Sequence, residues 1–351
     1  MQHLAAPDLL PIPEEGADRM ISNYIDLVLH PERYHGHDRR PPFFEGWYFK
    51  MISPDRSRRF AVIPGIFLSD DPGRHHAFIQ VFDGVSGAVG YHRFPAEAFQ
   101  ASRQGFDLRI GANRFTLEGI TLDIDDDQGV VQGEVRFGAA IPWTVTPREP
   151  GVMGWFGWMP FMECYHGILG FDHAVDGALS VNGATHDFSG GRGYIEKDWG
   201  KSFPGGWVWM QTNHFEQPDV SFTASIAIVP FLGRWFPGFL AGVWHEGRLY
   251  KFATYTGART EKLAISDHRV EWALRDRSLR LEVFAERAES SILPGPNRAD
   301  MSTRVPETLK ASIAIRLSAL GGGSREVFSG RGECAGLEVA GDVEKLMKAI
   351  R

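Results

Sequence analysis

Short stretches in which apolar and polar residues alternate recur along the chain, and they constrain its fold more than any other feature. Examples are HAFIQVFDG (76–84), VSFTASIAIV (220–229) and LRLEVFAE (279–286), and turn sequences such as DDPG (70–73) and VNG (181–183) separate such stretches. Strands at this short spacing, with Gly, Asp and Asn between them, are typical of β-sandwiches and barrels. The 40 glycines and 25 phenylalanines also suit many short strands around an aromatic interior. The sequence therefore predicts a mostly β fold.

The length of the chain, 351 residues, favours two domains or one large β architecture. GGRGY (190–194) is the expected joint, which divides the chain into domains at 30–190 and 191–351. Helical periodicity is confined to ADRMISNYIDLVLH (17–30) and DVEKLMKAIR (342–351), where Asp342 can cap the helix. Both helices are expected at the periphery.

Charge and cysteine content exclude several classes of function. Lys and Arg number 37 against 44 for Asp and Glu, so the chain has no strong positive field to attract nucleic acid. Cys164 and Cys334 lie far apart without CxxC spacing, which fits a reducing compartment and gives no thiolate zinc site. The start, MQHLAAPDLLPIPEEG, lacks the basic and apolar regions of a secretory signal. We therefore expect a cytoplasmic protein.

The most apolar segments are GVMGWFGWMPFM (151–162) and IAIVPFLGRWFPGFLAGVW (226–244). The second holds two prolines, three glycines and Arg234, which would break and charge a membrane-spanning helix, so a hairpin is expected. We predict core strands and corners for both segments. The alternative is an exposed lip that contacts a membrane or receives a lipid.

The stretch GYIEKDWGKSFP (193–204) places charges among aromatic residues. In a strand, alternation puts Tyr194, Glu196 and Asp198 on one face and Lys197 on the other. Carboxylates at i and i+2 lie roughly 6.5–7 Å apart at the backbone, so on a dry face repulsion would raise one pKa and leave a neutral proton donor. The alternative is a salt-bridged strand edge.

The following stretch, WVWMQTNHF (207–215), has Trp207, Trp209, Gln211 and Asn213 on a common face. Indole rings that are followed by amides along one wall are typical of an apolar pocket with a few orienting polar groups. FFEGWYFK (43–50) has the same character, with Glu45 and Trp47 on one face. Packed aromatic residues with hydrogen-bonded amides are the alternative.

The chain offers little for a metal or cofactor. Glu163 and His166 have the ExxH spacing of carboxylate-bridged metal sites, but such sites need a second copy, and none occurs. GKS (200–202) lacks the earlier glycine of a phosphate-binding loop, because position 195 is Ile. We expect neither a metal nor a cofactor.

Three stretches together resemble the tocopherol cyclase family: FFEGWYFK (43–50), PFMECYHGILGF (160–171) and GYIEKDWGKSFPGGWVWMQTNHF (193–215). The resemblance runs in order over roughly residues 40–340. It implies two lipocalin-like antiparallel β-barrels or sandwiches. Tocopherol cyclases protonate the prenyl double bond of a quinol, and the phenolic oxygen captures the cation. The implied partner is a small lipophilic substrate, prenylated quinol-like or terpenoid.

These observations predict cofactor-independent, acid-initiated cyclisation or isomerisation in an aromatic cavity near the junction of the two domains. Glu196 or Asp198 is the expected acid, with Glu45 and His166 as relay or base. The expected pocket residues are Trp47, Tyr48, Tyr194, Trp207 and Trp209 as walls and Gln211 and Asn213 as groups that orient oxygen atoms. A wet cavity would give a hydratase, a carrier would bind the ligand without chemistry, and aromatic platforms with paired carboxylates also occur in carbohydrate-active enzymes.

Overall fold

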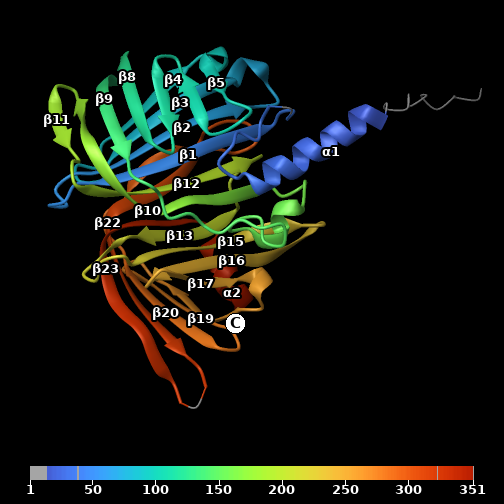
Figure 1. Cartoon of the computed structure of the whole chain (residues 1–351), viewed down its shortest axis with the longest axis vertical. Helices are drawn as coiled ribbons and strands as arrows, with labels where there is room; N and C mark the ends of the chain where they lie inside the picture. The colour runs from blue at the N-terminus through green and yellow to red at the C-terminus, as the bar shows by residue number, and fades with distance from the viewer. Residues whose placement is uncertain (1–13, 38, 322, 351) are drawn as a thin grey trace, which may run out of the picture.

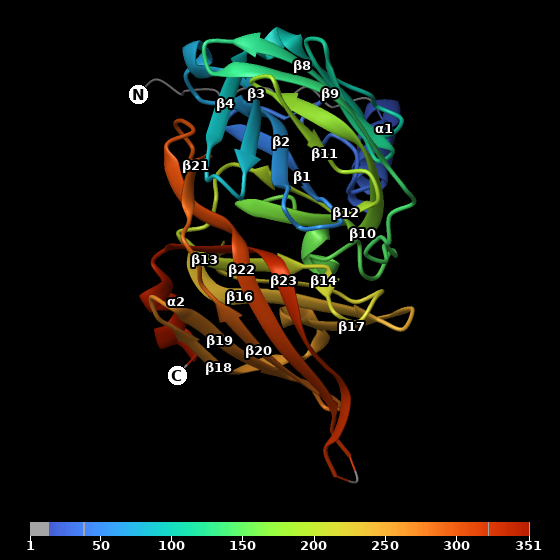
Figure 2. The ribbon, with the colours of Figure 1, turned by 90° about the vertical axis from the view of Figure 1, so that its left-hand side faces the viewer.

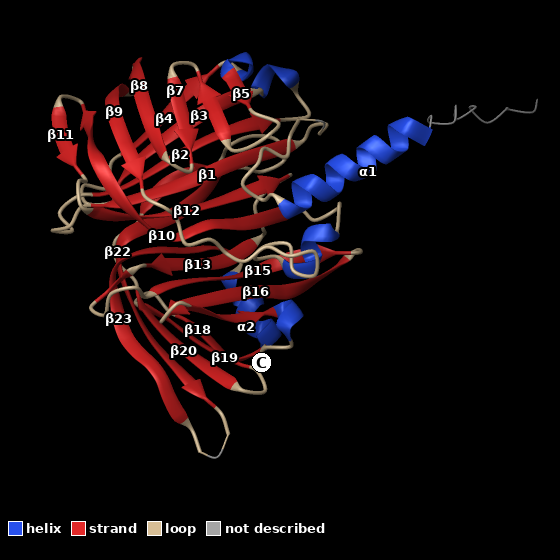
Figure 3. Ribbon diagram, viewed as in Figure 1, coloured by secondary structure: helices blue, strands red, loops and turns tan. Residues whose placement is uncertain are grey.

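The computed structural model describes residues 14–37, 39–321 and 323–350, and most of these lie in two large antiparallel sheets (Figure 1, Figure 3). The described part also holds two peripheral α-helices, α1 (Glu14–Leu29) and α2 (Val343–Ile350). The predicted fold class is confirmed. Residues 1–13, which carry most of the start used to argue against a secretory signal, lie outside the described residues.

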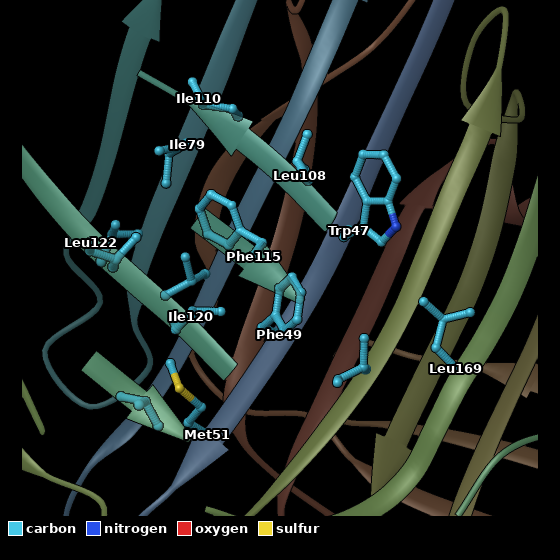
Figure 4. Packing of buried hydrophobic residues seen from close by; sticks show 14 of the residues in the cluster. Trp47, Phe49, Met51, Ile79, Leu108, Ile110, Phe115, Ile120, Leu122 and Leu169 are labelled. Atoms are coloured by element: carbon cyan, nitrogen blue, oxygen red, sulfur yellow. The ribbon is translucent and has the colours of Figure 1, made fainter. Parts of the chain in front are cut away.

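The first sheet has twelve strands in the order β4-β3-β2-β1-β12-β10-β9-β8-β7-β6-β5, with β11 on the far side of β10. Its strands are β1 (Phe43–Ile52), β2 (Arg59–Leu68), β3 (His76–Asp83), β4 (Val89–Phe94), β5 (Phe99–Ala101), β6 (Asp107–Ile110), β7 (Asn113–Thr116), β8 (Gly119–Asp126), β9 (Gly129–Phe137), β10 (Cys164–Val181), β11 (Ala184–Asp187) and β12 (Gly191–Gly200). The sheet curls around its own core. Figure 4 shows Trp47, Phe49 and Met51 of β1 pointing into that core with Phe115 and Leu122.

The second sheet has eleven strands in the order β17-β16-β15-β13-β23-β22-β20-β19-β18, with β14 on β23 and β21 on β22. Its strands are β13 (Gly206–Thr212), β14 (His214–Phe215), β15 (Ser221–Phe231), β16 (Arg234–His245), β17 (Arg248–Ala253), β18 (Arg259–Ile265), β19 (Arg269–Arg275), β20 (Leu279–Glu286), β21 (Ser291–Gly295), β22 (Thr303–Ala319) and β23 (Arg325–Gly341). Helix α2 adds Leu346 to the core of this sheet, and Asp342 caps the helix as predicted by accepting from Lys345 N at 3.0 Å.

Neither hydrogen-bonded path closes on itself within the described residues, so the two units are curled open sheets rather than closed barrels. The chain passes from one sheet to the other between Gly200 and Gly206. Strand β12 pairs with β1 and β10, so it belongs to the first sheet, although the boundary predicted near residue 190 had placed it in the second. The glycines of GGRGY (190–194), on which the boundary rested, did not show that β12 pairs with β1 and β10.

The two sheets pack against each other, with β1, β10 and β12 facing β13, β15 and β16 (Figure 2). A third apolar cluster fills the interface and includes Tyr48 and Tyr194 from the first sheet and Trp207, Trp209 and Leu240 from the second. Strands β12 and β13 are therefore covered on both faces, one by their own core and the other by the opposite sheet. This interface is where the candidate site lies.

The two apolar segments have different fates. Residues 226–244 form the predicted hairpin of β15 and β16, in which Phe231 pairs with Arg234. Residues 151–162 do not form core strands: a short 3₁₀-helix, η3 (Gly154–Trp158), lies in a loop whose Trp155 and Phe161 side chains are exposed. The expectation of core strands there was wrong. Val152 and Met162 are buried in the core, whereas Met153 and Phe156 are half-buried against it and line the cavity described below.

A fully buried ion pair joins β1 to β12 inside the first core. Lys197 contacts the Glu45 carboxylate, and neither side chain is exposed. Lys197 Nζ also donates to the backbone carbonyl of Arg33 at 2.6 Å and lies 4.8 Å from the ring centre of Trp47. Burial alone would raise the pKa of Glu45, but Lys197 and the hydrogen bonds from His35 outweigh it and hold the pKa below its ordinary value. The charges of Glu45 and Lys197 therefore neutralise each other, and we assign this ion pair a structural role.

Removing one member of this pair should destabilise the protein strongly. The Lys197→Met variant leaves Glu45 buried without its cation, so we expect the free energy of unfolding in urea to fall by about 3–5 kcal/mol. The double variant Glu45→Gln/Lys197→Met should recover part of that loss, because no unpaired charge remains. Lys348→Met, which breaks an exposed pair with Glu344, is the matched control and should cost at most about 1 kcal/mol. An equal loss in both lysine variants would contradict this assignment.

Candidate active site

A cavity of about 150 Å³, called the main cavity here, lies between the two sheets. Most of its lining is apolar and comes from both sheets and from the loop that carries η3. The lining residues are Val152, Met153, Phe156, Met162, Cys164, Tyr165, His166, Glu196, Asp198, Phe203, Pro204, Trp207, Trp209, Ser225, Ala227, Val229, Phe236, Gly238, Phe239, Leu240, Thr254, Tyr255 and Glu338. Such a hollow, with a few convergent polar groups, has the character of a ligand site.

Strand pairing places the polar groups of this cavity together. On β12, alternation turns Glu196 and Asp198 to the interface face, as predicted, and in the register with β10 Asp198 stands opposite His166. His166 Nδ1 lies 2.9 Å from Asp198 Oδ1, and His166 Nε2 lies 3.5 Å from Glu196 Oε2. The imidazole thus sits between the two carboxyl groups and can pass a proton between them.

Glu196 is nearly fully buried and receives two donors. Tyr194 Oη donates to Glu196 Oε2 at 2.5 Å and Trp209 Nε1 donates to the same oxygen at 3.0 Å. Burial raises the pKa of Glu196 to about 7; His166 opposes this rise, Asp198 adds to it, and the two donors oppose it. A substantial fraction of this carboxyl group is therefore protonated near neutral pH.

His166 is held in its charged form by the same neighbours. Burial lowers its pKa, but Glu196 and Asp198 outweigh that effect and raise the pKa to about 9. Because Glu196 and His166 interact directly, their protonation steps belong to the pair. The pair holds a proton at the polar end of an apolar cavity, which is the arrangement that general acid catalysis requires.

A second cavity of about 80 Å³ lies against the main cavity and shares Glu196, Asp198, Phe203 and Glu338 with it. Two further carboxyl groups lie at the interface, buried Glu307 and half-buried Glu338. Tyr48 Oη donates to Glu307 at 2.5 Å, and Trp207 Nε1 donates to Glu338 at 2.6 Å. Burial raises the pKa of Glu307 to about 7 and that of Glu338 well above its ordinary value. The acid region therefore extends beyond the two carboxylates that the sequence indicated.

The structure brings most of the predicted residues to this interface. Glu196, Asp198, His166, Trp207 and Trp209 line the main cavity, Tyr48 lines the second cavity, and Tyr194 supports Glu196 from behind. Their catalytic and binding roles stay predictions, because the structure shows their positions alone.

Five predicted residues line neither cavity: Tyr194, which supports Glu196 from behind, and the four described next. Glu45 and Trp47 do share a face of β1, but that face points into the core of the first sheet. Gln211 accepts from Lys50 Nζ at 2.9 Å, and Asn213 donates to Asp172 Oδ1 at 2.9 Å. Their placement at the pocket was wrong, because alternation tells which residues share a face and not which face meets the ligand.

Sequence reasoning missed Glu307, Glu338 and Tyr255. Glu307 and Glu338 occur in the stretches VPETLK and GLEVAG, and a single charge between apolar neighbours on a strand was the available signal. The Tyr255 hydroxyl is buried and has no hydrogen-bond partner among the described residues, and Tyr255 lines the main cavity. A ligand oxygen in the cavity would satisfy this donor.

One group of described residues has the donor types and spacing of a metal site. The ligand atoms of His166, Glu196 and Asp198 lie within 4.8 Å of one another. Glu163, which we considered beside His166, is instead bound by Arg298 and Ser202. Glu196 already accepts hydrogen bonds from Tyr194 and Trp209. The expectation that the protein needs no metal stays a prediction, which the assays below test.

The sequence of the chain also matches a known protein family. The model of the family described as tocopherol cyclase-like matches residues 96–341. This chain belongs to the tocopherol cyclase-like family. The matched range contains the second and third stretches on which the resemblance rested, whereas FFEGWYFK (43–50) precedes it.

Individual relatives are distant. A probable tocopherol cyclase of Oryza sativa subsp. japonica, described as chloroplastic, is 23% identical over 96% of this chain and 82% of its own length. Among solved structures, CghA with Sch210972 has a TM-score of 0.52 at 14% identity, over 86% of this chain and 89% of its own. An AttH-type protein of Nitrosomonas europaea has a TM-score of 0.51 at 12% identity, over 97% and 99% of the two chains. These structural likenesses establish the shared fold.

The buried carboxyl groups predict how stability depends on pH. In the folded protein Glu196 and Glu307 have pKa values of about 7, above their ordinary value, so folding takes up protons. Their contribution to stability is therefore complete at low pH and is lost as pH rises through about 7. We expect the free energy of unfolding to decline less between pH 5 and pH 8 in Glu307→Gln than in the native chain.

The control is Glu118→Gln, which changes an exposed carboxyl group in the turn after β7. Urea unfolding of the native chain and both variants across this pH range measures the difference. The prediction fails if Glu307→Gln and Glu118→Gln have the same pH dependence.

Proposed function

We propose that this protein catalyses acid-initiated cyclisation or isomerisation of a lipophilic substrate that carries an isoprenoid-type double bond, with Glu196 as the proton donor. The observation that carries the proposal is a buried carboxyl group, with its pKa raised to about 7, on the wall of an apolar cavity. Membership of the tocopherol cyclase-like family supports the broader statement that the protein is an enzyme that modifies a lipophilic isoprenoid.

An alkene is a very weak base, so its protonation needs a donor that stays protonated near neutral pH and a cation that is stabilised as it forms. In the proposed step Glu196 gives its proton to one alkene carbon, and the positive charge forms on the other. Trp207 and Trp209 lie on the wall of the same cavity, where cation–π contact contributes about 2 kcal/mol or more when desolvated. A cavity without bulk water also protects the cation from capture by solvent.

Ring closure neutralises the cation and returns the proton to the site. A hydroxyl oxygen of the same substrate attacks the cation, forms the new carbon–oxygen bond and releases its proton. The carboxylate of Glu196 regains a proton, directly or through His166, which lies between Glu196 and Asp198. The product is an isomer of the substrate, so neither a redox cofactor nor a co-substrate is required. Tyr255 would bind the substrate oxygen, because its hydroxyl has no partner in the described part of the chain and it lines the main cavity.

Hydration of the double bond is the second candidate, and the second cavity favours it. Gln80 is buried there, and its Oε1 has no partner within residues 14–37, 39–321 and 323–350; Glu196, Glu307 and Glu338 line the same space. A space with this many polar groups can hold water. Water that reached the cation before the internal hydroxyl group would convert the same acid site into a hydratase.

Incubation with a panel of prenylated hydroquinones in D₂O separates the candidates by mass spectrometry. A cyclase gives an isomeric product with one carbon-bound deuterium. A hydratase gives a product heavier by one heavy water, and a carrier returns the substrate unchanged. Recovery of unchanged substrate from every member, with substrate binding retained, would favour the carrier over the enzyme.

Glu196→Gln should reduce kcat roughly 10²–10⁴-fold, because the amide cannot deliver the proton. Asp198→Asn should have a smaller effect, since it changes the neighbour of His166 and leaves the donor in place. Glu118→Gln is the control and should retain full turnover. Activity should survive chelation with EDTA if the chemistry is protonic. Full turnover in both site variants would remove Glu196 and Asp198 from the mechanism.

The acid also predicts the pH dependence of turnover. Because the donor must be protonated, kcat should fall as pH rises above about 7, where Glu196 loses its proton. Initial rates between pH 5 and pH 9, compared with unfolding over the same range, separate this loss from destabilisation. A rate that increases steadily with pH would indicate a base in place of the acid.

A further inference from the structure

Exposed apolar side chains gather at the outer end of the main cavity. Trp155 and Phe161 in the η3 loop and Leu232 and Trp235 at the tip of the β15–β16 hairpin are all exposed. Half-buried rings connect them: Phe161 lies 5.7 Å from Phe231, and Phe156 lies 5.6 Å from Phe236, between ring centres. The name aromatic lip is used here for Trp155, Phe156, Phe161, Phe231, Leu232, Trp235 and Phe236.

The aromatic lip is continuous with the main cavity. Phe156 and Phe236 belong to both, and Val229 of the same hairpin also lines the cavity. Figure 1 shows the hairpin tip and the short helical turn of η3 beside each other on one side of the molecule. Helix α1 is tied to the same loop, because Tyr24 Oη donates to the backbone carbonyl of Trp158 at 2.6 Å.

Leu232 occupies a position where a polar residue is the rule. Among the residues that the structure describes, three hairpin turns have a non-glycine residue with positive φ followed by glycine: Asn182-Gly183, Leu232-Gly233 and Glu246-Gly247. Two of these residues are polar, as expected for an exposed left-handed turn position. Leu232 has φ of +48° and is 76% exposed. It therefore gains neither favourable backbone geometry nor burial within this chain.

The charge around the lip favours an anionic partner surface. Segments 150–162 and 220–244 contain no Asp or Glu. Exposed Arg234 lies between Leu232 and Trp235, and Lys345 Nζ lies 4.4 Å from the ring centre of Trp235. Indole rings with adjacent cations are typical of segments that insert at the headgroup level of a membrane.

We propose that the aromatic lip docks on the surface of a bilayer that contains anionic lipid. No helix among residues 14–37, 39–321 and 323–350 is long and apolar enough to cross a membrane, so the docking is peripheral. The docking rests on the exposed residues alone. Its consequence for the enzyme, that a lipophilic substrate passes from the bilayer into the cavity without crossing water, rests on the proposed function.

The test measures binding of the full chain to vesicles by flotation. Vesicles of phosphatidylcholine with phosphatidylglycerol should bind the protein more tightly than vesicles of phosphatidylcholine alone. The variant Leu232→Asn/Trp235→Ser should weaken binding at least about tenfold, because two apolar side chains no longer insert. Both residues lie outside the cavity lining, so turnover of substrate dispersed in detergent should be unchanged.

The matched control is Phe284→Ser/Ile292→Asn, which removes two exposed apolar side chains, 45% and 40% exposed, from strands β20 and β21. It should bind vesicles as the native chain does. Urea unfolding verifies that both double variants are folded.

Three results would overturn the docking proposal: a native chain that binds neither kind of vesicle, equal binding by the lip variant, or equal weakening by both double variants. Sedimentation of the native chain without lipid tests whether a second copy of the chain covers the lip instead. A dimer that the lip variant abolishes would mean that a second copy covers the lip. Full turnover in Glu196→Gln with vesicle binding intact would be a failure of the proposed function alone. Loss of turnover in Glu196→Gln in a protein that binds no vesicle would be a failure of the docking proposal alone.

Discussion

The packing of one sheet face against the other is the constraint on which the site depends. Glu196 lies on a strand, and a carboxyl group on a strand is ordinarily hydrated. Here Trp207 and Trp209 of β13 cover the interface face of β12, so the carboxyl group loses most of its water. The shift in its pKa follows from that loss and from the nearby carboxylates, with no unusual backbone geometry at residue 196.

Strand β12 places two neighbouring charges in opposite environments. Lys197 points into the first core, where Glu45 neutralises it and two indole rings cover it. Glu196 points to the interface, where its partner His166 is shared with Asp198. The charge of Lys197 is thus neutralised by its surroundings. The charge of Glu196 is only partly compensated by its surroundings, as is typical of groups that exchange protons.

Much of this arrangement could be predicted from period-two alternation. The fold class, the β15–β16 hairpin, the capped terminal helix, and the common face of Glu196 and Asp198 all follow from local patterns. Local patterns also indicated an aromatic wall that includes Trp207 and Trp209. These features depend on neighbours within a few residues, and a single sequence carries that information.

The rest depends on contacts between distant strands. Trp47 and Trp209 have similar surroundings in the sequence, yet one enters the first core and the other faces the cavity. Glu307 comes beside Tyr48 across 259 positions of the chain, and no local signal marks that approach. The assignment of β12 likewise required its pairing with β1 and β10. Which sheet face is covered, and by what, is a property of the tertiary fold.

The two ends of the main cavity are built from different kinds of structure. Glu196 and Asp198 stand on β12, which pairs with β1 on one side and β10 on the other, and His166 on β10 is held in register opposite Asp198. Phe156 stands on a loop, and Phe231 and Phe236 stand near a hairpin tip. Insertions and replacements at the loop end can reshape the entrance while the proton-handling end keeps its registration. A scaffold of this kind is suited to evolutionary diversification, because changes at the loop end can alter which hydrocarbon substrates enter while the acid group stays the same.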